Sequence, residues 1–82
     1  MEAEQIDEEI LRQLRQRGPG KSICPSEVAR SLFAHDTWRK KMDLVRERAR
    51  GLARTGILRI TQGERILDPE KEFRGPIRLR FR

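Results

Sequence analysis

The sequence predicts an α+β fold in which three helices are followed by a small antiparallel sheet. Apolar residues recur at helical spacings as far as Gly56, and beyond Gly56 the spacing changes to the alternation of extended strands. The chain has 82 residues, so we expect residues 1–82 to form one domain. It has one cysteine, and no apolar run approaches the roughly 20 residues that span a bilayer, so neither a disulfide framework nor a membrane partner is expected.

The first helix is predicted over residues 4–17. Ile6, Ile10 and Leu14 recur every four residues and mark its buried stripe. Acidic residues fill its first turns and arginines its last turn, and both placements suit the helix dipole. A Gly-Pro-Gly turn beginning at Gly18 ends the helix.

Residues 21–23 form a short extended link or one small strand, and the second helix is predicted over residues 25–33. Pro25 suits the first helical position because its missing N–H has no intrahelical partner there. Glu27, two positions later, complements the positive end of the helix dipole.

The third helix is predicted over residues 37–55, and it is strongly basic. Its apolar stripe consists of Trp38, Met42, Val45, Ala49 and Leu52. The other faces carry Arg39, Lys40, Lys41, Arg46, Arg48, Arg50 and Arg54. We expect Asp36 or Thr37 to accept a hydrogen bond from the first-turn amides, and Gly56 to adopt a left-handed conformation after the last turn.

Three strands are predicted after this helix, over residues 57–61, 65–67 and 76–81. A turn at residues 62–64 joins the first two, and the third should pair with this hairpin. The third strand alternates strictly, so its apolar and basic residues occupy opposite faces. One face carries Ile77, Leu79 and Phe81, and the other carries Arg78, Arg80 and Arg82.

The distribution of charge predicts a polyanionic partner. The net charge is +6, but five of the 13 acidic residues lie within the first nine positions. Residues 10–82 therefore hold all 19 basic residues against 8 acidic ones, a balance of +11. The single cysteine and an acidic N-terminus without a signal-peptide pattern predict a cytoplasmic location.

Three helices followed by a β-hairpin resemble a winged helix-turn-helix domain, in which a short turn such as residues 34–37 joins the second helix to the third. The run from Ile23 to Arg30, with the sequence ICPSEVAR, resembles the core motif of a bacterial family of proteins of unknown function. Further matching positions are Trp38-Arg39, Met42, Val45-Arg46, Gly56, Thr61-Gln62 and Gly75-Pro76-Ile77-Arg78-Leu79. The winged-helix resemblance implies binding of double-stranded DNA by fold analogy, as in a small transcriptional regulator.

In that arrangement the start of the third helix meets base edges, while flanking cations and the arginine strand follow phosphates. The predicted DNA-binding residues are Thr37, Arg39, Lys40, Lys41, Arg46, Arg50, Arg65, Arg78 and Arg80. Asp43 and Glu47 also point outward and either accept from cytosine amino groups, repel phosphate, or form ordinary helix salt bridges. A regulator of this kind would be a monomer or a weak homodimer.

Two alternatives remain open. The basic helix is also compatible with a solvated, charge-paired surface, and the arginine strand with a sheet edge protected against aggregation. The second alternative is a protein-interaction module, which gains support if Leu44 is exposed and joins Ile57 or Phe73 in one apolar patch.

No catalytic residue, cofactor site or metal site is predicted, and an enzyme is not expected. Cys24 precedes a helix, where a thiol can become reactive, but a lone cysteine beside apolar residues is more often a small buried side chain. His35 has neither a cysteine nor a second histidine nearby to complete a metal site, and we interpret it as a loop residue. Trp38 is expected to be a core or half-buried residue rather than a base-stacking one.

Overall fold

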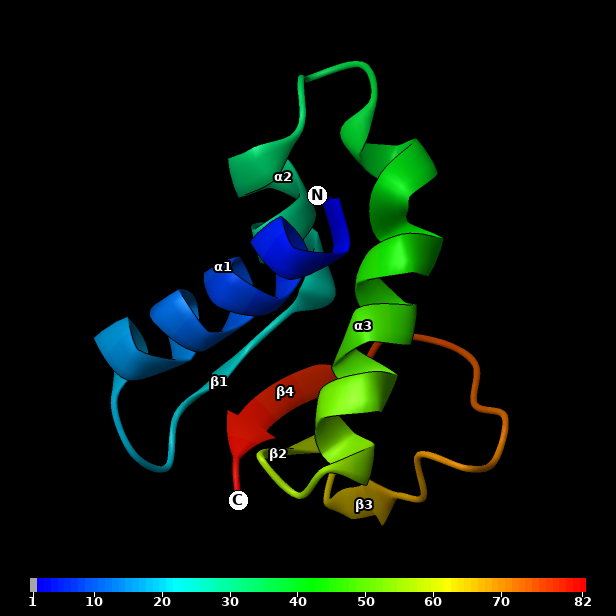
Figure 1. The fold of residues 1–82 in the computed structure, drawn as a ribbon. Coiled ribbons are helices and arrows are strands. Elements are labelled where there is room, and N and C mark those ends of the chain that lie inside the picture. The colour runs from blue at the N-terminus through cyan, green and yellow to red at the C-terminus, as the bar shows by residue number, and fades with distance from the viewer. Residues whose placement is uncertain (1) are drawn as a thin grey trace.

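The computed structural model describes residues 2–82 and has the predicted α+β architecture, with three helices on one side of a four-stranded antiparallel sheet (Figure 1). The helices are α1 (Glu2–Arg17), α2 (Pro25–Leu32) and α3 (Met42–Arg54), and a 3-10 helix, η1 (Trp38–Lys41), leads into α3. The strands are β1 (Ser22–Ile23), β2 (Leu58–Gln62), β3 (Arg65–Leu67) and β4 (Arg78–Phe81). This arrangement is compatible with a winged helix.

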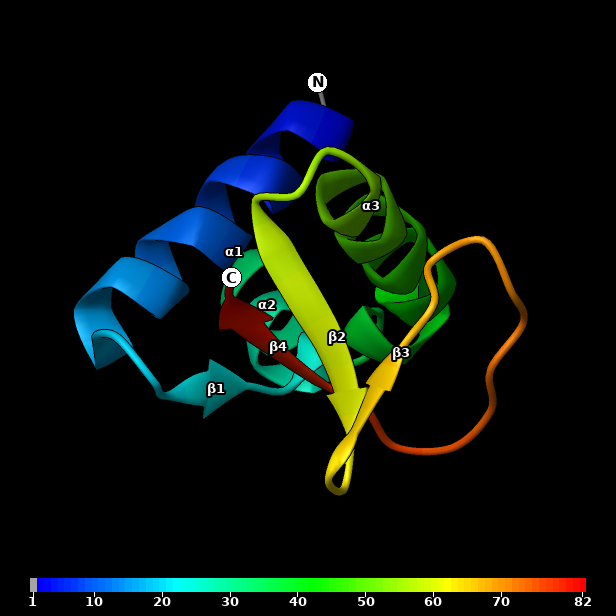
Figure 2. The ribbon, with the colours of Figure 1, turned by 90° about the horizontal axis from the view of Figure 1, so that it is seen from below.

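The sheet has the strand order β1-β4-β2-β3, and every neighbouring pair is antiparallel (Figure 2). The last strand, β4, lies between β1 and β2, as expected for a strand that pairs with the hairpin. Between β3 and β4 the chain leaves the sheet edge as a long loop, residues 68–77, which passes beside α3 before it returns to the centre (Figure 1).

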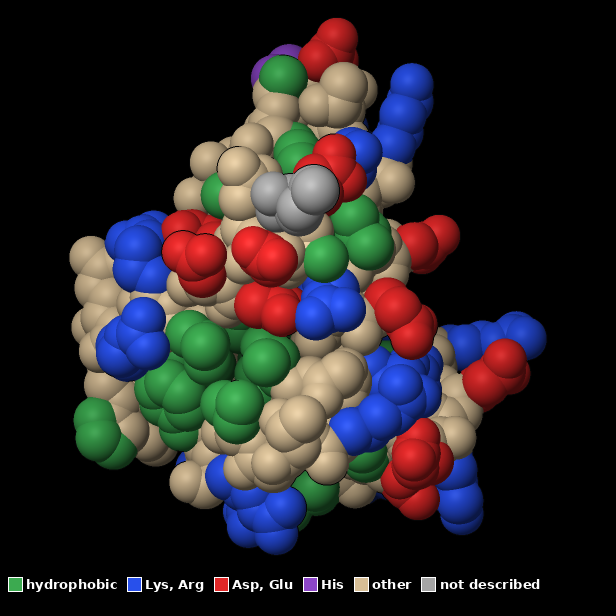
Figure 3. All heavy atoms as spheres, viewed as in Figure 1, with side chains coloured by type: hydrophobic (Ala, Val, Ile, Leu, Met, Phe, Trp, Pro, Cys, Tyr) green, Lys and Arg blue, Asp and Glu red, His purple; other side chains and the backbone are tan. Residues whose placement is uncertain are grey.

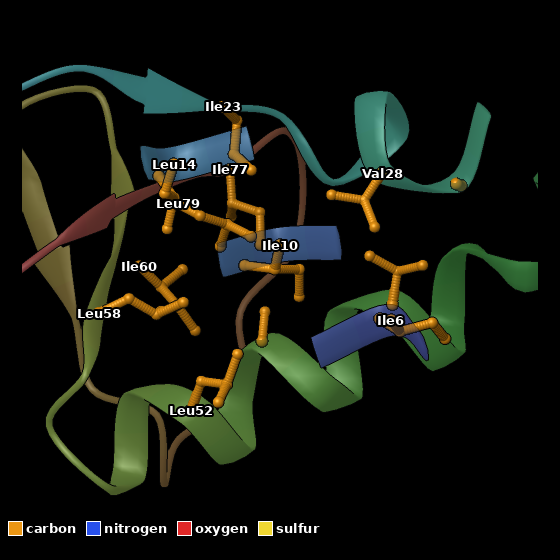
Figure 4. Close-up of a cluster of buried hydrophobic side chains, with 13 residues drawn as sticks. Ile6, Ile10, Leu14, Ile23, Val28, Leu52, Leu58, Ile60, Ile77 and Leu79 are labelled. Atoms are coloured by element: carbon orange, nitrogen blue, oxygen red, sulfur yellow. The ribbon is translucent and has the colours of Figure 1, made fainter. Parts of the chain in front are cut away.

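One apolar core holds the helices against the sheet (Figure 4). Ile6, Ile10 and Leu14 of α1 are fully buried, which confirms the predicted stripe. They meet buried side chains from α2, α3 and the inner face of the sheet, namely Ile23, Val28, Val45, Ala49, Leu58, Ile60 and Leu79. Each large aliphatic side chain buried here contributes roughly 1.5–3 kcal/mol to folding.

The start of α2 has the predicted geometry. Pro25 occupies its first turn, and the backbone N–H of Cys24 donates to Glu27 Oε2 at 2.6 Å. The Glu27 carboxylate therefore satisfies an N–H of the chain entering the helix, in addition to complementing the dipole.

The start of the third helix differs from the prediction. Trp38 to Lys41 form a tighter 3-10 turn, and the α-helix itself begins at Met42. Within residues 2–82, neither Asp36 nor Thr37 accepts a bond from the first-turn amides as predicted, and the Thr37 hydroxyl instead donates to the Ala34 carbonyl at 3.2 Å. The backbone N–H groups of Thr37 and Trp38 donate to the same carbonyl, so the chain turns tightly here before α3 can propagate.

The end of α3 matches the prediction. Gly56 has φ +83°, and its N–H donates to the Ala53 carbonyl at 3.1 Å. The N–H of Ile57 donates to the Leu52 carbonyl at 3.2 Å, which completes a Schellman cap. Because Ile57 closes this cap, β2 starts at Leu58 rather than at the predicted residue 57.

The remaining differences in boundaries are small. The first helix begins two residues earlier than predicted and the second ends one residue earlier, at Leu32. The third helix ends at Arg54 rather than at residue 55, and β2 extends to Gln62, which was predicted to lie in the turn. The last strand starts at Arg78 rather than at residue 76, because Pro76 has no N–H to donate to a neighbouring strand. Within residues 2–82, no helix combines the length and the apolar character that crossing a bilayer requires.

Candidate nucleic-acid interface

The nine predicted DNA-binding residues lie in four separate places. Thr37, Arg39, Lys40 and Lys41 lie at the turn between α2 and α3, at one end of the molecule. Arg46 and Arg50 lie on a flank of α3, Arg65 lies beside the hairpin turn, and Arg78 and Arg80 lie on β4. Figure 1 shows η1 and the sheet at opposite ends of α3, so the structure does not join these residues into one band.

The turn between α2 and α3 carries a cluster of cations around Trp38. The guanidinium carbons of Arg30 and Arg39 lie 4.5 Å and 4.8 Å from the centroid of the Trp38 ring. Lys40 is exposed on the next position of η1. We call this end of the molecule, around Trp38, the corner, and we call Arg30, Arg39 and Lys40 the corner cations. Among residues 2–82 none of the three forms an ion pair or a side-chain hydrogen bond.

Trp38 holds this cluster in place. Its ring is half-buried and packs against the apolar core, as predicted. The two guanidinium groups stack on a ring that is fixed by the core, which restricts their positions without neutralising their charge. A hollow of about 460 Å³ opens here, lined by Arg30, Phe33, His35, Trp38 and Arg39.

Two of the predicted contacts at this end are engaged within the protein. The Thr37 hydroxyl binds the Ala34 carbonyl, as described above. Lys41 Nζ lies 2.9 Å from Glu2 Oε2 and 5.5 Å from the centroid of the Phe33 ring, so it joins η1 to α1 and α2.

Arg46 and Arg50 hold the 68–77 loop against α3. Arg50 Nη1 donates to the carbonyls of Pro69 at 2.6 Å and Lys71 at 2.9 Å. Arg46 Nη2 donates to the Gly75 carbonyl at 3.3 Å. Both guanidinium groups also lie over the ring of Phe73, at 5.6 Å for Arg46 and 4.5 Å for Arg50. The flank that should face phosphates is thus covered by the chain's own loop.

Other side chains of α3 are also paired. Arg48 makes two bonds to Asp7 of α1, at 2.9 Å and 2.7 Å, and this carboxylate raises the pKa of the Arg48 guanidinium. Arg54 Nε donates to Glu70 at 2.7 Å. Asp43 and Glu47 are exposed, and Glu47 lies 3.7 Å from Arg50. The middle of α3 therefore presents acidic groups to solvent, while most of its cations serve internal contacts.

The arginines of β4 lie on the outer face of the sheet, because Ile77 and Leu79 point into the core. Arg80 stands directly opposite Arg59 of β2 and opposite Ser22 of β1. Arg78 is held along β1, where it donates to the Ser22 hydroxyl and carbonyl, both at 3.0 Å, and to Cys24 Sγ at 2.7 Å.

Arg65 lies apart from the other predicted residues. It pairs with Gln62 at the end of the hairpin, and its side chain is exposed. The two-residue turn beside it begins at Gly63, whose φ of +62° suits the first position of a type II′ turn.

Sequence reasoning missed Arg30 as a member of the interface. It lies near the end of α2, which was given no role in DNA binding, and only the packing of α2 against η1 brings it to Trp38. An exposed arginine one turn before a short connection into a tryptophan is a signal that could have found it.

Cys24 and His35 are the remaining residues that were considered for reactivity or metal binding. Cys24 is half-buried and accepts the bond from Arg78, and His35 lies exposed in the turn after α2. Across residues 2–82, no group of three or more His, Cys, Asp or Glu side chains is arranged to hold a metal ion.

The chain is an α+β protein with three helices over an antiparallel sheet, and its last strand lies inside that sheet. This architecture is compatible with that of winged-helix proteins. The chain belongs to the DUF3253 family of proteins of unknown function, whose model matches residues 3–82. A comparison with curated proteins finds no match.

Proposed function

We propose that the protein binds double-stranded DNA in the manner of a winged helix, with the corner cations as its leading contacts. The observation that carries this proposal is the cluster of Arg30, Arg39 and Lys40 around Trp38, none of which forms an ion pair within the described chain. Helix-turn-helix proteins present the start of the second helix of the motif to the major groove.

The corner cations are suited to phosphates and to guanine. Arginine can donate two parallel hydrogen bonds to guanine O6 and N7, and lysine or arginine can neutralise phosphates on the groove walls. Stacking on Trp38 limits the side-chain freedom that the arginines would lose on binding, which lowers the entropic cost of association.

The acidic surface of the protein also favours an oriented complex. Figure 3 shows several acidic side chains close together over the upper part of the face that includes α1, with Lys and Arg side chains and an apolar patch on the same face. The N-terminal half of α1 carries Glu2, Glu4, Asp7 and Glu8. These four acidic residues would repel a polyanion, so DNA would approach from the corner rather than along the N-terminal half of α1.

The alternative, a protein-interaction module, gains support if Leu44 is exposed and joins Ile57 or Phe73 in one apolar patch. Leu44 and Phe73 are half-buried and pack against the core, and Phe73 is also covered by Arg46 and Arg50. Ile57 alone of the three is exposed, at 42%. We therefore expect a Leu44→Asp variant to lose stability rather than to lose only a partner.

The proposal is tested by fluorescence anisotropy with a labelled duplex at several salt concentrations. The logarithm of the affinity should fall linearly with the logarithm of salt, with a slope of about −0.9 for each neutralised phosphate. Replacing all three corner cations by alanine should weaken binding and make the slope shallower by as much as about 2–3.

The matched control replaces Arg15, Lys21 and Lys71 by alanine and so removes the same charge from another part of the surface. These three side chains are exposed and form no hydrogen bond or ion pair within residues 2–82. This control should keep most of the affinity. If the folded wild-type protein does not bind duplex DNA at low salt, or if the two triple variants lose affinity equally, the proposal is wrong.

A further inference from the structure

The outer face of the sheet carries a second cluster of cations, which consists of Arg59, Arg78 and Arg80 and which we call the sheet-face arginines. Arg59 and Arg80 are directly opposite each other in the antiparallel pair of β2 and β4. Side chains at such positions have their Cβ atoms about 5 Å apart, so two guanidinium groups repel each other there unless an anion lies between them.

The bonding of Arg80 is incomplete. Its Nε is buried, and within residues 2–82 it has no hydrogen-bond partner. A buried donor without an acceptor is costly, and an outward shift of the Arg80 side chain would let a bound oxyanion supply the missing acceptor. Its neighbour Arg78 is held by Ser22 and Cys24, so its charge has a fixed position on the same face.

Among residues 2–82, no acidic side chain forms an ion pair with the sheet-face arginines. The residues that share it on β1, β2 and β3 are Ser22, Thr61 and Ile66, as the strand register and the inward burial of their neighbours show. Hydroxyl groups and guanidinium groups together are typical of surfaces that follow a phosphate backbone without reading bases.

The sheet face and the corner are far apart and point in different directions. Figure 1 shows η1 beyond one end of α3 and the sheet beyond the other, and Figure 2 shows the sheet in front of the helices when the molecule is viewed along this direction. The 13 residues of α3 alone span about 20 Å at 1.5 Å per residue. A straight duplex lying across the corner therefore cannot reach the sheet-face arginines.

We propose that one chain binds two duplex segments at the same time, one at the corner and one on the sheet face, and thereby bridges them. This inference rests on the proposed function, because the corner must bind DNA for a bridge to form. On the sheet face, Arg59 and Arg80 bind a phosphate between them, with no preference for sequence, and the fixed charge of Arg78 beside them adds to the attraction for the DNA backbone.

A capture experiment tests the bridge. An unlabelled duplex is fixed to beads, a fluorescent duplex of unrelated sequence is added, and the full-length protein is titrated. The beads should retain the fluorescent duplex at intermediate protein concentrations and release it at excess protein, because each duplex is then saturated by separate chains.

An Arg59→Gln/Arg80→Gln variant separates the two surfaces. It should keep corner binding, measured by anisotropy, within about threefold of wild type, and should lose at least tenfold in capture. A variant with Arg15→Gln and Lys71→Gln removes the same charge from exposed, unpaired positions and should capture normally. Circular dichroism confirms that each variant is folded.

The outcomes are distinct. Absence of any DNA binding by the wild-type protein defeats the proposed function. If the wild-type protein binds DNA but captures no second duplex, the proposed function stands and the bridge is wrong. The bridge is also wrong if capture survives in the Arg59→Gln/Arg80→Gln variant, because dimers would then join duplexes through their corners. The bridge would also be wrong if the sheet-face arginines bound polyglutamate but not DNA, because the ligand of this face would then be an acidic peptide.

Discussion

Glu9 is the single charged residue that the fold buries among residues 2–82, with 8% of its surface exposed. Its carboxylate accepts bonds from Arg12 at 2.8 Å and 2.6 Å, from Gln13 at 2.7 Å and from Ser31 of α2 at 2.7 Å. Bonding to Arg12, supported by Gln13 and Ser31, outweighs the opposing effect of burial and lowers the pKa of Glu9 from 4.5 to about 2. The charged form of Glu9 therefore helps to join α1 to α2.

This pKa predicts how stability depends on pH. Because the folded pKa is depressed, the stabilisation by Glu9 is fully present above pH 4.5 and is lost as the pH falls towards 2. Since the Arg12 side chain is 55% exposed, we discount the shift and expect Glu9→Gln to cost about 1–2 kcal/mol at pH 7. The difference from wild type should vanish near pH 2 in urea titrations followed by circular dichroism.

The neighbouring exposed residue provides the control for this prediction. A Glu8→Gln variant should change the unfolding free energy by less than about 0.5 kcal/mol at either pH. A Glu9→Gln cost that stays constant between pH 7 and pH 2 would mean that Glu9 acts through packing and not through its charge.

Two glycines of the α3 region should respond to alanine with opposite signs. Gly56 has φ +83°, a conformation that strains an L-residue, so Gly56→Ala should destabilise the protein by about 1 kcal/mol. Gly51 lies inside α3 with no atom near the position of an added Cβ, so Gly51→Ala should stabilise it by up to about 1 kcal/mol. In a small domain, thermal midpoints should move by about 4–8 °C per kcal/mol, downward and upward respectively.

At the scale of elements, most of the fold could be predicted because local patterns specify it. The stripe of α1, the proline start of α2, the glycine end of α3 and the alternation of β4 each depend on residues a few positions apart. The 3-10 start of the third helix could not be predicted in this way. It depends on the Thr37 hydroxyl bonding backward to Ala34 instead of forward into the helix, and both are ordinary uses of a threonine.

The 68–77 loop is the element whose fixed position depends most on distant contacts. Phe73 packs against the core beneath Arg46 and Arg50, so Phe73→Ala should remove about 1–3 kcal/mol and loosen the loop. Hydrogen exchange measured by mass spectrometry should become faster in residues 68–77 while α1 keeps its protection.

Glu72→Ala is the matched control for the loop, because its side chain is exposed and makes no hydrogen bond or ion pair within residues 2–82. Exchange in the loop should then resemble that of wild type. Equal acceleration by both variants would show that Phe73 does not anchor the loop.

At the scale of the whole molecule, the candidate site was predicted only in part. The sequence indicates which residues are cationic but not which cations are engaged inside the protein. Arg46 and Arg50 bind carbonyls 19 to 29 residues away, and backbone carbonyls leave no pattern in a sequence. Arg39 and Lys40 were predicted, whereas Arg30 could join them only after α2 had packed beside η1.

The proposed bridge predicts the oligomeric state of the protein in the absence of DNA. Both cation clusters belong to one chain, so we expect a monomer of 9.7 kDa without DNA, measured by light scattering after size-exclusion chromatography at moderate salt. Its compactness should match the Cα radius of gyration of 11.7 Å, close to the value of about 12 Å for a folded chain of this length. A stable dimer of 19 kDa (about twice the monomer mass) would instead favour bridging through paired corners.

The closure of the 68–77 loop over α3 affects how an alanine scan of this protein would have to be interpreted. Substituting Arg46 or Arg50 would remove bonds to loop carbonyls, so a poor yield or a low melting point would accompany any weaker binding. Such variants would look like defective binders in a screen scored by signal alone. Normalising each variant to its folded fraction would separate residues that touch a ligand from residues that keep the scaffold closed.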